Sequence, residues 1–155
     1  MPSESVIMSS AAEARFRVQA PNSTPRAITV IALDAASERV VRRLADRAWN
    51  RASFLTAHAT LRDLTGQPLV LDDRIAAADL IVMVASAGGH ADAAAAIGRA
   101  SSDRRVMTTA LIIGTETASE AALAKTLAQV RPWSLMVVMA DADDYIEDML
   151  QALRA

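Results

Sequence analysis

The stretch IVMVASAGGHADAAAAIGRA, residues 81–100, holds the residue types of this chain that are best placed for chemistry. An apolar run ends at Ser86, a glycine pair follows at Gly88 and Gly89, and His90 precedes an alanine-rich segment. Glycines before a helix can bring backbone N–H groups close to a phosphate. An imidazole, whose pKa lies near neutrality, can act as a base or a metal ligand. The simpler interpretation is a tight turn between a strand and a helix, which glycines also allow.

Further candidates come from the ends of the other expected strands. In open α/β sheets, ligands bind outside the carboxyl ends of the strands, near the point where the strand order reverses. If the first strand lies between the second and the central one, Asp34 lies between His58 and His90. The candidate ligand-binding residues at this edge are Asp34, His58, Ser86, Gly88, Gly89, His90, Glu116 and Asp141.

A metal site built from His58, His90 and Asp34 is a further hypothesis. Imidazole and carboxylate are suitable metal ligands, but the chain has no H-x-x-x-H or H-E-x-x-H spacing. Nucleophilic catalysis has less support, because VASAGG around Ser86 is not the G-x-S-x-G pattern of a nucleophile elbow. The catalytic residues and any cofactor are therefore left unassigned.

Phosphate-binding signatures are missing from the sequence. The first expected strand is followed by ALDAASER, where a dinucleotide-binding fold has G-x-G-x-x-G, and no G-x-x-x-x-G-K-[ST] occurs. Acidic residues stand at the expected helix starts. There the positive end of the helix dipole stabilises their charge, and the same charge would repel a phosphate. The sequence therefore predicts no binding of GTP, ATP or NAD. These acids are Glu38, Asp92, Glu116, Glu120, Asp141, Asp143 and Asp144.

The elements that position these residues are predicted from short β-branched apolar runs that alternate with helical spacing. This alternation predicts a single doubly wound parallel sheet of five or six strands, Rossmann-like or flavodoxin-like, with helices on both faces. A weaker strand is expected at ASFLTA, and a sixth if residues 68–71 pair at an edge. The expected central strands are Ala27–Asp34, Leu80–Ser86, Val106–Gly114 and Ser134–Ala140.

Domain and helix boundaries follow from turn and capping residues. Residues 1–26 are polar and aperiodic and end in APNSTPR, which predicts a flexible N-terminal tail ahead of one domain at 27–155. Ser37 is expected to cap the first helix, Thr117 to form a capping box with Glu120, and Asp141 or Asp143 to cap the last helix.

Composition narrows the class of protein. The chain has 155 residues, a net charge of −2 and 3% aromatic residues. It therefore lacks both the excess of basic residues and the aromatic stacking residues that are typical of nucleic-acid-binding proteins. It lacks cysteine, which excludes disulfides and thiolate metal sites. No apolar run approaches the roughly 18 residues of a membrane span, and no signal peptide is evident. We expect a cytoplasmic protein without membrane partners.

Residues 77–114, AADLIVMVASAGGHADAAAAIGRASSDRRVMTTALIIG, resemble the middle of the tubulin/FtsZ GTPase domain. Ala78 and Asp79 precede the strand, Gly88 and Gly89 stand where that family has a phosphate loop, and a threonine pair opens the next strand. The glycine loops are degenerate, and the chain is too short for the family's second domain. The resemblance covers about a quarter of the chain and implies a Rossmann-like nucleotide-binding fold that does not hydrolyse GTP.

Two classes of function remain open at this point. The first is a non-catalytic module that binds a protein partner or itself, with Met139 and Met149 as candidate interface residues. The second is a small-ligand or metal-binding protein, or an enzyme, that uses Asp34, His58 and His90. A pocket at this edge with both imidazoles within about 5 Å of a common point, close enough for shared ligation, favours the second class, whereas imidazoles that face apart favour the first.

Overall fold

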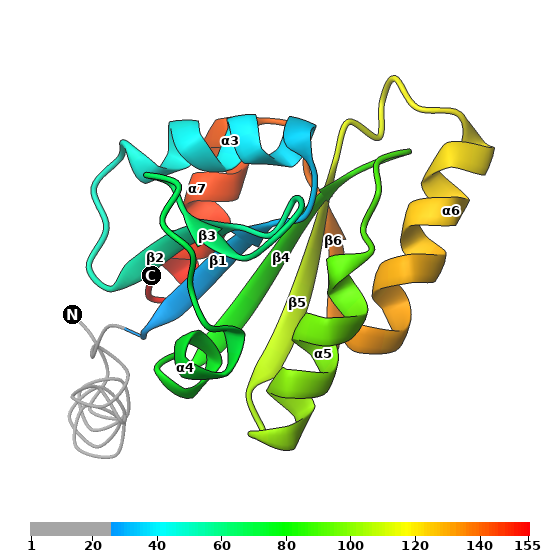
Figure 1. Ribbon diagram of the computed structural model, residues 1–155. Helices are drawn as coiled ribbons and strands as arrows, with labels where there is room; N and C mark the ends of the chain where they lie inside the picture. Colours follow the sequence, from blue (N-terminus) through cyan, green and yellow to red (C-terminus); the bar gives the residue numbers. More distant parts are fainter. Residues whose placement is uncertain (1–25) are drawn as a thin grey trace, which may run out of the picture.

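The computed structural model describes residues 26–155, which form an α/β domain on one six-stranded, mostly parallel sheet (Figure 1). Of the predicted tail, residues 1–25 lie outside the described residues. Its last residue, Arg26, donates its backbone N–H to the carbonyl of Arg154 at 2.8 Å. The described chain therefore begins beside its own C-terminus.

Strands and helices follow one another along the chain much as the apolar runs predict. The strands are β1 (Ile28–Ala32), β2 (Ala52–Thr56), β3 (Arg62–Asp63), β4 (Leu80–Ser86), β5 (Met107–Ile113) and β6 (Met136–Met139). The helices are α3 (Ala35–Ala45), α4 (Leu71–Ala76), α5 (Ala93–Asp103), α6 (Glu120–Val130) and α7 (Asp143–Ala152), with a 3₁₀ turn η1 (Arg131–Trp133) before β6.

The sheet order is β3-β2-β1-β4-β5-β6, and every pairing except β2 with β3 is parallel. The predicted parallel pairing among the four long apolar runs is confirmed. All of β1 and most of β4 are buried, as expected for strands covered on both faces. The placement of the last run as a central strand was wrong, because β6 is the outer edge of the sheet.

The opposite edge also differs from the prediction. The edge strand is β3, antiparallel to β2, rather than residues 68–71. Pro68 forms only an isolated bridge with Arg62, and Leu71 already begins α4. Proline cannot donate to a strand ladder, which limits it to such edge positions.

Two hydrophobic cores cover the two faces of the sheet. One core packs Val41 and Leu44 of α3 and Ile146 and Leu150 of α7 against the sheet. The other core lies under α4, α5 and α6 and includes Ile97. Within residues 26–155, no helix has the length and apolar character needed to cross a membrane.

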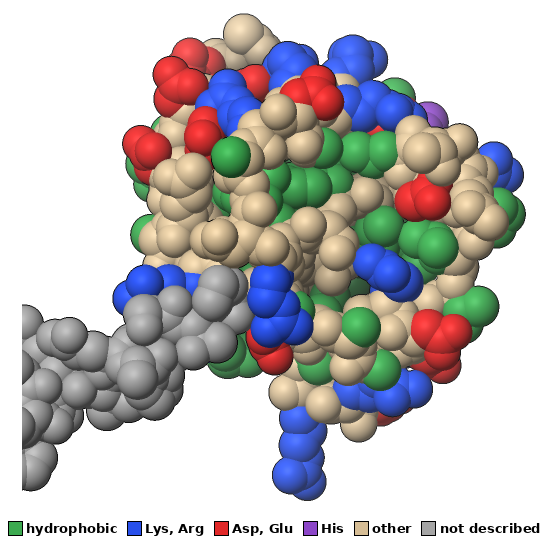
Figure 2. Space-filling model, turned by 90° about the vertical axis from the view of Figure 1, so that its left-hand side faces the viewer, with side chains coloured by type: hydrophobic (Ala, Val, Ile, Leu, Met, Phe, Trp, Pro, Cys, Tyr) green, Lys and Arg blue, Asp and Glu red, His purple; other side chains and the backbone are tan. Residues whose placement is uncertain are grey.

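Ion pairs tie α3 to α7 at the rim of the first core. Arg43 donates to both carboxylate oxygens of Asp143, at 2.7 and 3.1 Å. Arg47 contacts Asp144 and Glu147. On the side that carries β2 and β3, acidic and basic side chains are interspersed along the upper surface and hydrophobic side chains gather below them (Figure 2).

Helix capping differs from the sequence-based expectations at all three helices. Asp34, not Ser37, is the N-cap of α3. Ser37 is the third helical residue, and its side chain accepts the backbone N–H of Asp34. Ser119 rather than Thr117 caps α6, and the last helix begins after Ala142 without a side-chain cap. Several acceptors crowd these segments, so the sequence does not say which of them reaches the helix N–H groups.

Candidate functional site

Asp34 lies between β1 and α3 and is almost fully buried. Its Oδ1 accepts the backbone N–H of Ser37 at 2.8 Å, and its Oδ2 accepts the backbone N–H of Ser86 at 2.8 Å. The Ser37 hydroxyl accepts the Asp34 N–H in return. Both carboxylate oxygens therefore hold the ends of β1, β4 and α3 together, which is a structural role rather than the orientation of an imidazole.

The glycine pair packs closely against this carboxylate. A Cβ on Gly89 would lie 2.5 Å from Asp34 Oδ2 and 2.5 Å from Ser86 Oγ. Gly88 has φ of +86°, in the left-handed region that favours glycine. The glycines are thus required by a tight strand-to-helix turn over Asp34.

Helix α6 secures the loop that follows β4. The Gly88 N–H donates to Thr126 Oγ1 at 2.9 Å, and the Ala91 N–H donates to Gln129 Oε1 at 3.1 Å. Gln129 also donates to Asp92 at 3.0 Å. The Gly89 N–H donates to the carbonyl of Ser86 at 2.9 Å. Three backbone donors that a phosphate nest would use are therefore already bonded within the protein.

The two histidines lie on the same pocket. Because β1 pairs with both β2 and β4, the loops after those strands flank Asp34, as the sequence predicts. His58 and His90 line a pocket of about 560 Å³ together with Leu33, Ala57 and Asp92. Asp34 is not among the residues that line this pocket. The imidazoles therefore share one opening, while the buried carboxylate lies apart from it.

The metal hypothesis gains no support from this arrangement. Among residues 26–155, no group of three or more histidine, aspartate or glutamate side chains is placed to hold a metal ion. Both histidines are exposed. The pocket can therefore offer two imidazoles and one carboxylate to a small molecule that enters from solvent.

Glu116 and Asp141 belong to a different part of the carboxyl edge, at the ends of β5 and β6. Asp141 accepts the backbone N–H of Thr115 at 3.0 Å and its hydroxyl at 2.9 Å. Partial desolvation acts to raise the pKa of Asp141, but hydrogen bonds from Thr115 and from the backbone of Gly114 and Glu116 together outweigh it and lower the pKa. Asp141 therefore fastens one loop to the next, and Glu116 lies exposed beside it.

An exposed apolar patch at the outer edge of the sheet could not be predicted from the sequence, apart from Met139. We call it the β6 patch: Met107, Leu135, Met136 and Met139, which are 46%, 75%, 47% and 52% exposed. These make up four of the six large hydrophobic side chains exposed among the described residues. Met149, the other predicted interface residue, instead packs against the core under α3 and α7.

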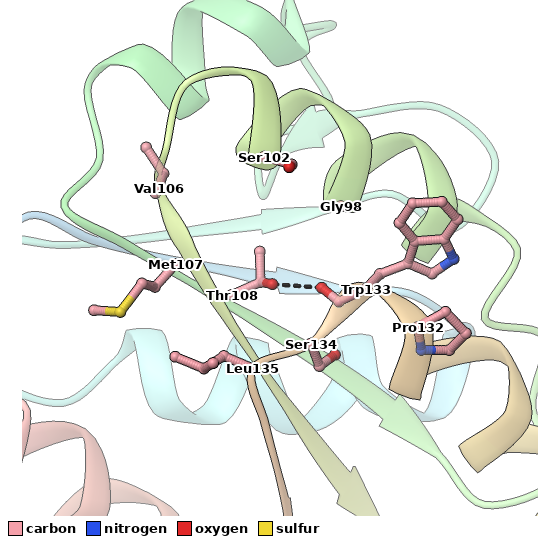
Figure 3. A pocket seen from close by; sticks show the side chains of 9 residues that line it. All are labelled: Gly98, Ser102, Val106, Met107, Thr108, Pro132, Trp133, Ser134 and Leu135. Carbon is pink, nitrogen blue, oxygen red and sulfur yellow. Dashed lines mark hydrogen bonds between the residues drawn. The ribbon is translucent and has the colours of Figure 1, made fainter.

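A pocket of about 370 Å³ lies beside the β6 patch, at the amino ends of β5 and β6 (Figure 3). Gly98 and Ser102 of α5 form one wall, and Trp133 and Leu135 form another. Thr108 donates its hydroxyl to the carbonyl of Trp133 across the gap. A Cβ on Gly98 would lie 2.5 Å from Trp133 Cβ, so only glycine at this position lets the tryptophan pack this closely against α5.

Comparison with known proteins adds no relative. No protein-family model matches the chain, and no curated protein matches it significantly.

Proposed function

We propose that this protein is a non-catalytic, doubly wound Rossmann-like module that binds a protein partner or a second copy of itself through the β6 patch. The strand order, with its reversal between β1 and β4, and the helices on both faces support this fold assignment. The observation that carries the function is that four exposed large hydrophobic side chains flank one edge of the sheet, with Met107 and Met136 toward one face and Leu135 and Met139 toward the other.

Exposure of this kind costs free energy in water, about 25 cal/mol per Å² of apolar surface that a partner could cover. Single apolar residues are normal on a protein surface, whereas apolar side chains on both faces of an edge strand without charge or proline suit pairing with another strand. Methionines suit such a surface because their flexible thioether side chains adapt to an irregular partner. Three of the four residues in the β6 patch are methionine.

The polar groups at the carboxyl edge of the sheet support this choice, because they already form hydrogen bonds within the protein. The Asp34 carboxylate and the loop N–H groups of Gly88, Gly89 and Ala91 are engaged within the protein. A general base needs a substrate proton within reach, and an oxyanion site needs donors that are not already bonded. Neither requirement is met by these groups.

The proposal can be tested by site-specific photo-crosslinking in the native host. A benzoylphenylalanine placed at Leu135 should form a discrete protein adduct, because this side chain is the most exposed member of the β6 patch. The matched control is the same residue at Val70, which is 62% exposed and lies outside the β6 patch. No adduct at Leu135, or equal adducts at both positions, would refute the proposal.

A second candidate function is the binding of a small molecule between His58 and His90, and the shared 560 Å³ pocket favours it. Native mass spectrometry of protein purified from its host should then show a bound small molecule. His90→Ala should abolish the added mass without changing the thermal midpoint, because the side chain is exposed. Absence of any added mass in the unmodified protein would count against this candidate.

A further inference from the structure

We infer that the occupant of the β6 patch is a second copy of this chain, paired antiparallel along β6 about a two-fold axis. This inference rests on the proposed function and goes beyond it by naming the partner and its orientation.

The outer side of β6 is open to pairing. β6 pairs with β5 from Met136 to Met139, and no other described strand lies on its other side. Natural sheets protect such edges with charged side chains, proline or bulges. Residues 133–140, WSLMVVMA, contain neither a charge nor a proline. This edge therefore keeps both the backbone groups and the apolar side chains that another strand requires.

Charge distribution selects the antiparallel orientation. The amino end of β6 follows Arg131, and Arg104 and Arg105 lie nearby, ahead of β5. The carboxyl end is followed by Asp141, and Glu116 comes after the adjacent β5. A two-fold axis perpendicular to the sheet brings the basic end of each copy against the acidic end of the other. A parallel arrangement would place like charges together, which disfavours association.

The same orientation brings a methionine to the pocket beside β6. Met139 is aligned with Ile112, which belongs to the core under α4, α5 and α6. The 370 Å³ pocket is on that same side, because residues of α5 line it. A two-fold axis perpendicular to the sheet keeps the faces of both copies on the same side. If the axis passes at Val137, Met139 of the second copy lies opposite Leu135, which lines the pocket that Figure 3 shows.

The test measures self-association of the full chain by analytical ultracentrifugation. The unmodified protein should sediment as a dimer. Leu135→Lys and Met139→Lys should each raise the dissociation constant at least about tenfold, because they place a charge on the paired edge. Val70→Lys, which changes another exposed aliphatic side chain outside the β6 patch, should leave the constant unchanged. Circular dichroism checks that each variant is folded.

Orientation is tested by disulfide crosslinking, for which the natural absence of cysteine is an advantage. Two single-cysteine variants, Leu135→Cys and Met139→Cys, are mixed and oxidised, with one of them isotope-labelled so that mass spectrometry identifies the mixed product. The mixture should give a mixed disulfide dimer, and each variant alone should crosslink less. Strong crosslinking of each variant with itself and little mixed product would indicate parallel pairing and overturn the inference.

Charge reversal provides an independent readout. Arg131→Glu should weaken the dimer, and adding Glu116→Arg should recover part of the loss. A monomeric unmodified protein, or a dimer that Leu135→Lys leaves unchanged, would overturn the second-copy inference. If Leu135 crosslinks to a different protein in the host while the purified chain stays monomeric, the proposed function stands and only the second-copy inference falls.

Discussion

The carboxylate of Asp34 accepts the backbone N–H of Ser86 across the junction of β1 and β4, at 2.8 Å. This bond joins the ends of two adjacent parallel strands at the place where the strand order reverses. In many α/β proteins a ligand occupies this place. Here the side chain of Asp34 binds the end of β4, and Gly89 packs against it.

Asp34→Ala should therefore destabilise the domain strongly. The substitution removes an N-cap, worth about 1 kcal/mol, and leaves the Ser86 N–H without its acceptor, at a further cost of about 1–3 kcal/mol. Asp34→Asn should cost less, because its single amide oxygen can still accept one of the two N–H groups. Urea unfolding followed by circular dichroism measures the differences.

The matched control is Asp72→Ala, which removes an exposed carboxylate from the first turn of α4. Its effect should stay within about 0.5 kcal/mol, as is usual for surface substitutions. An Asp34→Ala variant as stable as this control would show that the two hydrogen bonds contribute nothing to the free energy of unfolding.

Gly89→Ala should also destabilise the protein, by about 1–3 kcal/mol, because the added methyl group would overlap Asp34 and Ser86. Gly66→Ala is the comparison: Gly66 has φ of +93° but no atom near its added Cβ. It should lose only the backbone preference, about 1 kcal/mol. Equal losses at both sites in thermal unfolding would mean that the loop moves aside freely.

Much of the sheet could be predicted from the sequence, because continuous β-branched runs such as β1 and β4 have few other stable environments. Position within the sheet could not. The apolar run at Leu135–Met139 looks like a buried strand, and only the strand order reveals that it is an edge. Apart from Met139, the exposed methionines therefore carried no recognisable signal in the sequence.

The order of the loops around Asp34 could be predicted from the sequence, but the hydrogen bonds that Asp34 makes could not. Strand ends correctly placed Asp34 between the loops that carry His58 and His90. The spacing of Asp34 and Ser37 was a readable sign of a capping box. The contact of Gly88 with Thr126 could not be predicted from the sequence, because 38 residues separate them and only the packing of α6 brings them together.

The ion pair between Arg43 and Asp143 should make stability depend on pH. Hydrogen bonds from Arg43 lower the pKa of Asp143. The folded pKa is thus below the unfolded value of about 3.9, so the stabilisation is complete above that value and is lost as the pH falls through the folded pKa. Asp143→Asn should cost about 1 kcal/mol or less at pH 7, and less again in acid.

Urea unfolding of both proteins at neutral pH and near pH 2–3, in the range below the unfolded pKa, gives this comparison. Asp148→Asn on the same helix controls for the loss of one negative charge. If the cost of Asp143→Asn stayed constant between the two pH values, the contact with Arg43 would not be the source of the stabilisation.

Finally, the protein should not bind GTP, ATP or NAD at micromolar concentrations. The N–H groups of Gly88, Gly89 and Ala91 already donate to Thr126, Ser86 and Gln129. A phosphate would have to displace these bonds without regaining their energy.

The neighbouring charge also opposes an anion, because Asp92 lies at the start of α5, where a phosphate would approach the helix dipole. Isothermal titration with each nucleotide, with and without magnesium, should show no saturable heat. A micromolar dissociation constant corresponds to a binding free energy of about −8 kcal/mol, which is strong enough for titration calorimetry to detect. Binding of any of the three nucleotides at that level would contradict the prediction and support the resemblance to the tubulin/FtsZ family.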